Sequence, residues 1–197
     1  MKKHICVFGD SIAYGRSDME NGGWANRLML SMLNESTDYT VVYNLGIPGE
    51  LMLEAPKRIS AEASYRKPGL SILALGVNDT EHDSALGLPA TSESDFKSAA
   101  EKVIAALKQH SEKTLALSIL NVHPENPKKY SNDAIARYNE ILSDVGARQG
   151  TEQLNVFGLL DPTTDFSPDG IHPNSRGHQK IFEKVLPIAK KLTEDTK

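Results

Sequence analysis

Four short polar blocks contain the residue types that acyl transfer requires. They are Gly9-Asp10-Ser11, Asn44-Leu45-Gly46-Ile47-Pro48-Gly49, Gly76-Val77-Asn78-Asp79 and Asp169-Gly170-Ile171-His172-Pro173. A serine hydroxyl attacks a carbonyl carbon effectively only when a base accepts its proton, and histidine titrates nearest to neutral pH. Each block by itself also suits an ordinary turn. The four together favour a serine hydrolase site over four unrelated turns.

The residue types and their spacing suggest a role for each candidate residue. Ser11 is the candidate nucleophile, and His172 is its candidate base. Asp169, three residues before His172, can fold back onto Nδ1 of the imidazole and leave Nε2 for Ser11. A tetrahedral intermediate also needs fixed donors for its oxyanion. The predicted donors are the backbone N–H groups of Ser11 and Gly46 and the side-chain amide of Asn78.

Apolar runs between these blocks predict the elements that position them. Short runs rich in Ile, Val and Leu, typical of buried parallel strands, cover residues 4–8, 40–45, 70–75 and 114–120, with a weaker fifth at 154–157. Amphipathic helical patterns lie between and after them. The first contains Trp24, and the clearest starts after Ser92, a predicted cap. Pro56 and Pro187 fall within such patterns, where each should kink or restart the helix.

Alternation of strands and helices predicts an α/β fold with right-handed crossovers. We expect one domain over residues 1–197, a three-layer α/β/α sandwich with a five-stranded parallel sheet, flavodoxin-like in outline. Such sheets bind ligands at the carboxyl ends of their strands. Three of the four polar blocks directly follow a predicted strand, which places them at this edge.

The four blocks resemble those of the SGNH hydrolases, also called GDSL-type esterases and lipases, in the same order. The namesake residues would be Ser11, Gly46, Asn78 and His172, and Ile12 stands where the GDSL name has Leu. The resemblance implies Ser11 as nucleophile, His172 as general base and acid, Asp169 as its orienting group, and an oxyanion hole of Ser11, Gly46 and Asn78. It also implies the family's α/β/α fold, no metal and no organic cofactor. The implied activity is hydrolysis of a carboxylic ester, a thioester, a lysophospholipid or an acetylated sugar.

Composition excludes several other classes of protein. The chain has 197 residues and a net charge of −4, without a basic stretch typical of nucleic-acid binding. Its longest apolar run, residues 103–107, is far shorter than the roughly 20 residues of a membrane span. The apolar run near the N-terminus is too short for a secretory signal, so we expect a cytoplasmic protein with no membrane partner.

The single cysteine, Cys6, is expected to be buried. His172 and His178 lack the spacing of helical zinc ligands, so no metal is expected.

Two binding functions remain as alternatives to hydrolysis. The first is a flavodoxin-like small-molecule or phosphate-binding module without hydrolase activity, although Asp18 and Glu20 in the first loop would repel phosphate. The second is a phospho-acceptor domain that uses Asp10. We interpret Asp10 and Asn44 as structural hydrogen-bonding residues, Asp79 as a loop brace or substrate contact, and His178 as a surface or packing residue.

The substrate is expected to be a small, neutral, water-soluble ester, such as an acetylated sugar. The segments 79–95 and 121–133 that should rim the cleft are polar and show no amphipathic lid helix. The opposite possibility is an apolar tunnel lined by Trp24 and Leu28. Neither the physiological ester, the oligomeric state nor any substrate-binding residue follows from the sequence.

Overall fold

A single five-stranded parallel sheet organises the computed structural model, which describes residues 4–35, 40–82, 87–126 and 129–194. The sheet has the order β2-β1-β3-β4-β5. Its strands are β1 (His4–Gly9), β2 (Val41–Gly46), β3 (Leu70–Ala74), β4 (Lys113–Leu117) and β5 (Glu152–Leu154). This is the flavodoxin-like strand order, and the predicted α/β class is confirmed.

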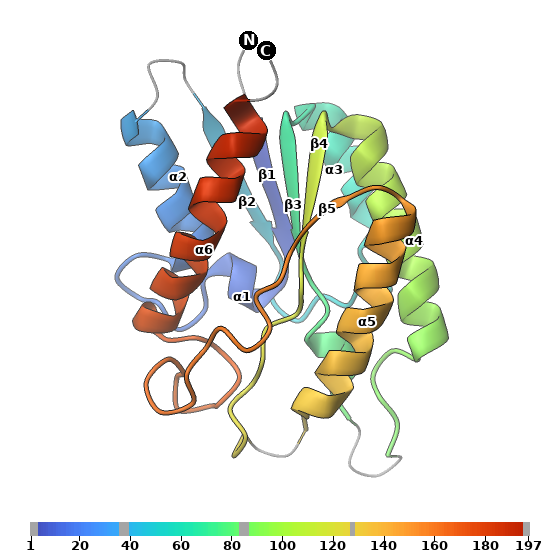
Figure 1. Ribbon diagram of the computed structural model, residues 1–197, viewed down its shortest axis with the longest axis vertical. Coiled ribbons are helices and arrows are strands. Elements are labelled where there is room, and N and C mark those ends of the chain that lie inside the picture. The colour runs from blue at the N-terminus through green and yellow to red at the C-terminus, as the bar shows by residue number, and fades with distance from the viewer. Residues whose placement is uncertain (1–3, 36–39, 83–86, 127–128, 195–197) are drawn as a thin grey trace.

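Helices cover both faces of this sheet (Figure 1). They are α1 (Ser11–Tyr14), α2 (Gly23–Glu35), α3 (Pro56–Arg66), α4 (Glu93–His110), α5 (Asn132–Arg148) and α6 (Ser175–Glu194), with a 3₁₀ turn, η1 (Asn78–Thr80). Helices α2 and α6 pack against each other on one face, while α3, α4 and α5 form the other layer. The three-layer prediction is therefore confirmed.

Apolar burial explains why these segments form the core. In β1, Ile5 to Phe8 are completely buried, as expected of a strand covered on both faces. Cys6 belongs to this run, and burial raises the pKa of its thiol to about 12. The helix α4 begins where its sequence predicts, because Ser92 Oγ accepts the Asp95 N–H and caps the first turn.

The fifth strand differs in detail from its prediction, and the two prolines have different effects on their helices. The strand β5 shares only Leu154 with the predicted segment 154–157. The reason is that the N–H groups of Val156 and Phe157 donate to Ser118 Oγ. Pro56 starts α3, whereas α6 continues through Pro187 to Glu194 without a restart.

The strand register brings the polar blocks together. In β1, Gly9 lies opposite Gly46 of β2 on one side and opposite Ala74 of β3 on the other. The chain segments that follow these three strands therefore leave the sheet side by side. Because β1 lies between β2 and β3, this is also the switch point at which such sheets bind ligands.

Candidate active site

Ser11 is the first residue of α1, a four-residue helix at the end of β1. Asp10 is its N-cap, and Asp10 Oδ1 accepts the Ile12 N–H at 2.8 Å. Gly15 ends the helix with φ of 102°, a conformation that favours glycine. The Ser11 N–H has no partner inside the helix, because the first N–H groups of any helix lack one. Asp10 thus serves as the structural acceptor that the sequence predicted.

Ser11, His172 and Asp169 form one hydrogen-bonded series. Ser11 Oγ lies 2.8 Å from His172 Nε2, and His172 Nδ1 lies 2.7 Å from Asp169 Oδ2. An ionised carboxylate only accepts hydrogen bonds, so Nδ1 carries the proton and donates it to Asp169. The Nε2 lone pair of the neutral imidazole then faces the serine hydroxyl. The structure therefore brings these three predicted residues together in the geometry of a nucleophile, a base and an orienting acid.

Asp169 stays ionised because donors surround it. Partial burial alone would raise its pKa, but the backbone N–H groups of His172 and Ile171, the His172 ring and the Ser167 hydroxyl all donate to the carboxylate. These bonds outweigh burial and hold the pKa of Asp169 well below its usual range. The same side chain therefore provides a lasting negative charge beside His172.

The loop after β4 braces the turn that carries Asp169 and His172. The His123 N–H donates to the Gly170 carbonyl at 2.8 Å. Gly170 has φ of 68°, and a Cβ there would lie only 3.1 Å from Asn126 Cα. Glycine at this position thus permits both the turn and the close approach of the loop.

Gly46, predicted as an oxyanion donor, lies where β2 packs against α1. Its N–H donates to Asn44 Oδ1 at 3.1 Å, so that N–H is already occupied within the loop. A Cβ at Gly46 would lie 2.4 Å from Tyr14 N and 2.8 Å from the Asp10 carbonyl oxygen. Glycine is needed here because β2 packs directly against the backbone of α1. Asn44, whose Nδ2 donates to the Ala13 carbonyl, supports the same contact as predicted.

Gly49, three residues further along, offers an exposed backbone N–H. Its φ is 81°, and an added Cβ would meet nothing within 4 Å. Its N–H has no protein partner among the described residues. Asn78 Nδ2 donates to the carbonyl of the next residue, Glu50, at 3.0 Å. The Asn78 amide and the Gly49 loop are therefore neighbours, and spacing alone could not distinguish the two glycines of this block.

Two carboxyl groups lie buried beneath this site. Asp10 is 2% exposed and Asp79 is 0% exposed. Burial raises the pKa of Asp10 to about 7, although the hydrogen bond from the Ile12 N–H lowers it. The nearby carboxylates of Asp79 and Glu50 raise this pKa further. Burial likewise raises the pKa of Asp79 to about 6, opposed by the Met52 N–H bond. The burial of Asp79 favours the loop-bracing interpretation over a substrate contact.

His178 and Trp24 are internal residues that hold α2 and α6 together. His178 is fully buried; its Nδ1 accepts the Trp24 N–H at 3.3 Å, and its Nε2 lies 2.9 Å from the Arg16 carbonyl. His178 is thus a packing residue rather than a surface one. Within the described residues, no three His, Cys, Asp or Glu side chains form a potential metal site.

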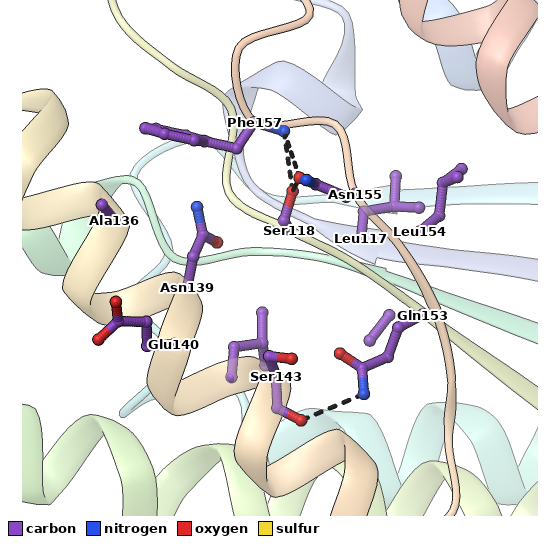
Figure 2. Close-up of a pocket in the computed structure, with 12 residues that line it drawn as sticks. Leu117, Ser118, Ala136, Asn139, Glu140, Ser143, Gln153, Leu154, Asn155 and Phe157 are labelled. Carbon is purple, nitrogen blue, oxygen red and sulfur yellow. Dashed lines mark hydrogen bonds between the residues drawn. The ribbon is translucent and has the colours of Figure 1, made fainter.

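A separate pocket of about 450 Å³ lies between α5 and the β4–β5 edge of the sheet (Figure 2). None of the residues of the hydrogen-bonded series lines it. Two of its polar side chains bond to neighbouring lining residues, since Ser118 Oγ donates to Asn155 Oδ1 and Gln153 Nε2 to the Ser143 carbonyl (Figure 2). This pocket therefore has no part in the candidate chemistry.

Comparison with known proteins identifies the family. The model of the GDSL-like lipase/acylhydrolase family matches residues 7–180. The chain belongs to this family. Esterase TesA of Pseudomonas aeruginosa is 28% identical to this GDSL-like chain over 190 residues, which are 95% of this chain and 88% of that protein. The chain is accordingly a hydrolase that acts on ester bonds, as its sequence predicts.

Solved structures share the fold of this GDSL-like hydrolase. The lipase/acylhydrolase from Enterococcus faecalis superposes with a TM-score of 0.81 at 18% identity and covers 96% of each chain. The acetylxylan esterase Axe2 from Geobacillus stearothermophilus gives a TM-score of 0.76 at 14% identity, over 94% of this chain and 93% of that one. Among the described residues, no helix is long and apolar enough to cross a membrane.

Proposed function

We propose that the protein is a serine esterase that works through an acyl-enzyme on Ser11. Ser11 Oγ attacks the ester carbonyl while its proton passes to His172 Nε2. His172 then returns the proton to the departing alcohol as the C–O bond breaks. A water molecule, deprotonated by the same nitrogen, attacks the acyl-enzyme and releases the acid and Ser11. Asp169 holds the imidazole in the required tautomer and stabilises its positive charge.

The proposed oxyanion hole consists of the Ser11 N–H, the Asn78 amide and the Gly49 N–H. Gly49 takes the place predicted for Gly46, because the Gly46 N–H is already bonded to Asn44. Asn78 Nδ2 has two protons and bonds to Glu50 with one, so the second remains for substrate. Side-chain and backbone groups therefore supply every step, and we expect activity to persist in EDTA. Loss of activity in EDTA that a divalent metal restores would contradict this expectation.

The observation that carries the proposal is the continuous series from Ser11 Oγ through His172 to an ionised Asp169. It predicts that a fluorophosphonate probe labels Ser11 covalently and that Ser11→Ala abolishes both labelling and ester hydrolysis. A small-molecule or phosphate-binding module would show neither labelling nor turnover. Turnover that survives in purified Ser11→Ala would show that another residue is the nucleophile.

We propose a short acyl group, from acetyl to about butyryl, on a small neutral alcohol such as a sugar. Trp24 and Leu28 are 1% and 0% exposed, and the cavity beside Trp24 has only about 30 Å³, roughly the space of one water molecule. The described residues thus offer no tunnel there for a long chain. The fold it shares with an acetylxylan esterase is compatible with such a substrate.

A series of p-nitrophenyl esters tests the acyl preference. We expect kcat/KM to be highest at two to four carbons, because a longer chain would gain about 0.8 kcal/mol per methylene only if an apolar groove buried it. A maximum at ten or more carbons would overturn the proposal for a short acyl group but leave the serine mechanism intact.

A further inference from the structure

Asp79 lies where three segments around the proposed oxyanion hole meet. It follows Asn78 directly in η1, and its side chain is completely buried. Its Oδ2 accepts the Met52 N–H, from the loop between β2 and α3, at 2.9 Å. Its carbonyl accepts the Thr91 N–H, just before α4, at 3.2 Å. One residue therefore joins the Asn78 turn to two other segments.

Two parallel hydrogen bonds join η1 to the loop that carries Gly49. Asn78 donates to the Glu50 carbonyl, and two residues further along the loop Met52 donates to Asp79. A single hydrogen bond would let the loop rotate relative to η1, whereas two hydrogen bonds fix its position and orientation on η1. The Asp79 bond is the inner one, since Asp79 is completely buried while Asn78 lies partly open to solvent. Water therefore cannot take the place of Asp79 as the acceptor of the Met52 N–H.

We propose that Asp79 is a positioning residue that holds the Asn78 amide and the Gly49 N–H in one rigid oxyanion hole. The inference rests on the proposed function, because it presupposes that these two groups bind the oxyanion. Donors stabilise a transition state well only when they are already aimed at it, since reorganisation during the reaction consumes the benefit. Without Asp79, the Met52 N–H would lose its partner and the Gly49 loop would lose its inner anchor.

Asp79 performs this role without needing a negative charge. Among the described residues, Asp79 Oδ1 and the buried hydroxyl of Thr91 make no hydrogen bond of good geometry, but Thr91 lies close enough to lower the pKa of Asp79. The carboxyl groups of Asp10 and Glu50 lie nearby, and burial raises the pKa of Asp79 to about 6. An amide oxygen in place of Oδ2 can also accept the Met52 N–H, through a weaker, uncharged hydrogen bond. Asparagine should therefore substitute for Asp79, whereas alanine should not.

The test compares Asp79→Ala and Asp79→Asn with Asn78→Ala and a control, Ser71→Ala. Ser71 is equally buried in β3, but it bonds to Ser111 and lies outside the proposed site. Each rate is divided by the concentration of active sites, which is measured as the amount of protein labelled by a fluorophosphonate once labelling is complete. Unfolded protein is not labelled and therefore does not contribute to this concentration. We expect Asp79→Ala to lower kcat about 10- to 100-fold with KM nearly unchanged, somewhat less than the roughly 10²- to 10³-fold loss from removing a donor itself. Asp79→Asn should stay within about threefold of the parent, because it keeps the bond to Met52.

Coupling between the variants separates positioning from a general effect on stability. Because Asp79 acts through Asn78, the double variant Asn78→Ala/Asp79→Ala should be less damaged than the product of the two single losses. The rate constant for fluorophosphonate inactivation should fall in Asp79→Ala in parallel with kcat and stay unchanged in Ser71→Ala. An unchanged kcat per labelled site in Asp79→Ala would overturn the inference, as would a loss in Asp79→Asn as large as in Asp79→Ala. If Ser11→Ala retained turnover, the proposed function itself would fail, so the two failures are distinguishable.

Discussion

At the scale of single residues, the proposed chemistry depends on which atom holds the proton between His172 and Asp169. Asp169 accepts from four donors and remains an anion, so the proton between it and His172 belongs to Nδ1. This arrangement leaves Nε2 as the only nitrogen able to accept from Ser11. In the proposed mechanism, loss of any one of these three residues disables the other two, because none of them performs its step alone.

His172→Ala should be about as damaging to kcat as Ser11→Ala, a loss of several orders of magnitude. Asp169→Asn should do less harm, since the base remains and only its tautomer and charge stabilisation suffer. The double variant Ser11→Ala/His172→Ala should be little worse than either single one. Steady-state rates of the three purified variants test this, and a full multiplicative loss in the double variant would argue against a shared mechanism.

At the scale of elements, the contact between β2 and α1 determines where Ser11, the proposed nucleophile, lies. Gly46 lets the strand pass directly over the helix backbone at Tyr14 and Asp10. The helix is only four residues long and depends on the Asp10 cap. Its position, and with it that of Ser11, is therefore set by packing around it rather than by helix propensity.

Gly46→Ala should lower both stability and activity. Its new methyl group would lie 2.4 Å from Tyr14 N, so α1 must shift and carry Ser11 away from His172. We expect a loss of about 2–4 kcal/mol in the free energy of unfolding, as for overpacked sites with little room to relax. Gly158→Ala is the matched control, because Gly158 lies outside the proposed site, its Cβ meets no atom within 4 Å, and only its positive φ of 78° costs about 1 kcal/mol. Thermal unfolding and kcat are measured for both variants. Equal destabilisation by the two changes would contradict the packing argument.

At the scale of the whole molecule, buried titratable groups affect stability in opposite directions. His178 connects α6 to the loop before α2, and burial holds its pKa below the usual value in spite of the Arg16 bond. Asp10 and Asp79 have raised pKa values for the same reason, burial of a group that can carry charge. The histidine therefore favours the folded state at higher pH, and the two carboxyl groups favour it at lower pH.

His178 should make the parent protein lose stability as the pH falls below about 6.5, the usual pKa of histidine in the unfolded chain. Below that value the unfolded state binds a proton that the folded state does not bind, because a protonated Nδ1 could not accept the Trp24 N–H. The loss is about 1.4 kcal/mol per pH unit until the folded pKa is reached. In His178→Gln the fall in Tm between pH 7.5 and 5 should be smaller than in the parent. An equal fall in Tm in both proteins would show that His178 does not cause it.

Asp79→Asn should show the opposite trend. Between the unfolded pKa of about 3.9 and the folded value of about 6, the folded parent binds more protons than the unfolded chain, so its stability falls as the pH rises. The asparagine variant lacks this titration. Its Tm relative to the parent should therefore increase from pH 4 to pH 7, by the equivalent of up to about 3 kcal/mol. A difference in Tm that does not change with pH would show that Asp79 has an ordinary pKa.

The sequence by itself determined the α/β class, the residues of the hydrogen-bonded series and the edge of the sheet where they gather. Apolar runs and polar blocks at strand ends are local patterns, and Asp169 and His172 are only three residues apart. Only the tertiary structure distinguishes Gly46 from Gly49, which share one loop and differ in what packs against them. The bonds of Ser118 that end the fifth strand early, and the burial of Asp79 and His178, likewise depend on contacts between segments far apart in the chain. No local pattern contains them, because the partner of each group comes from another element.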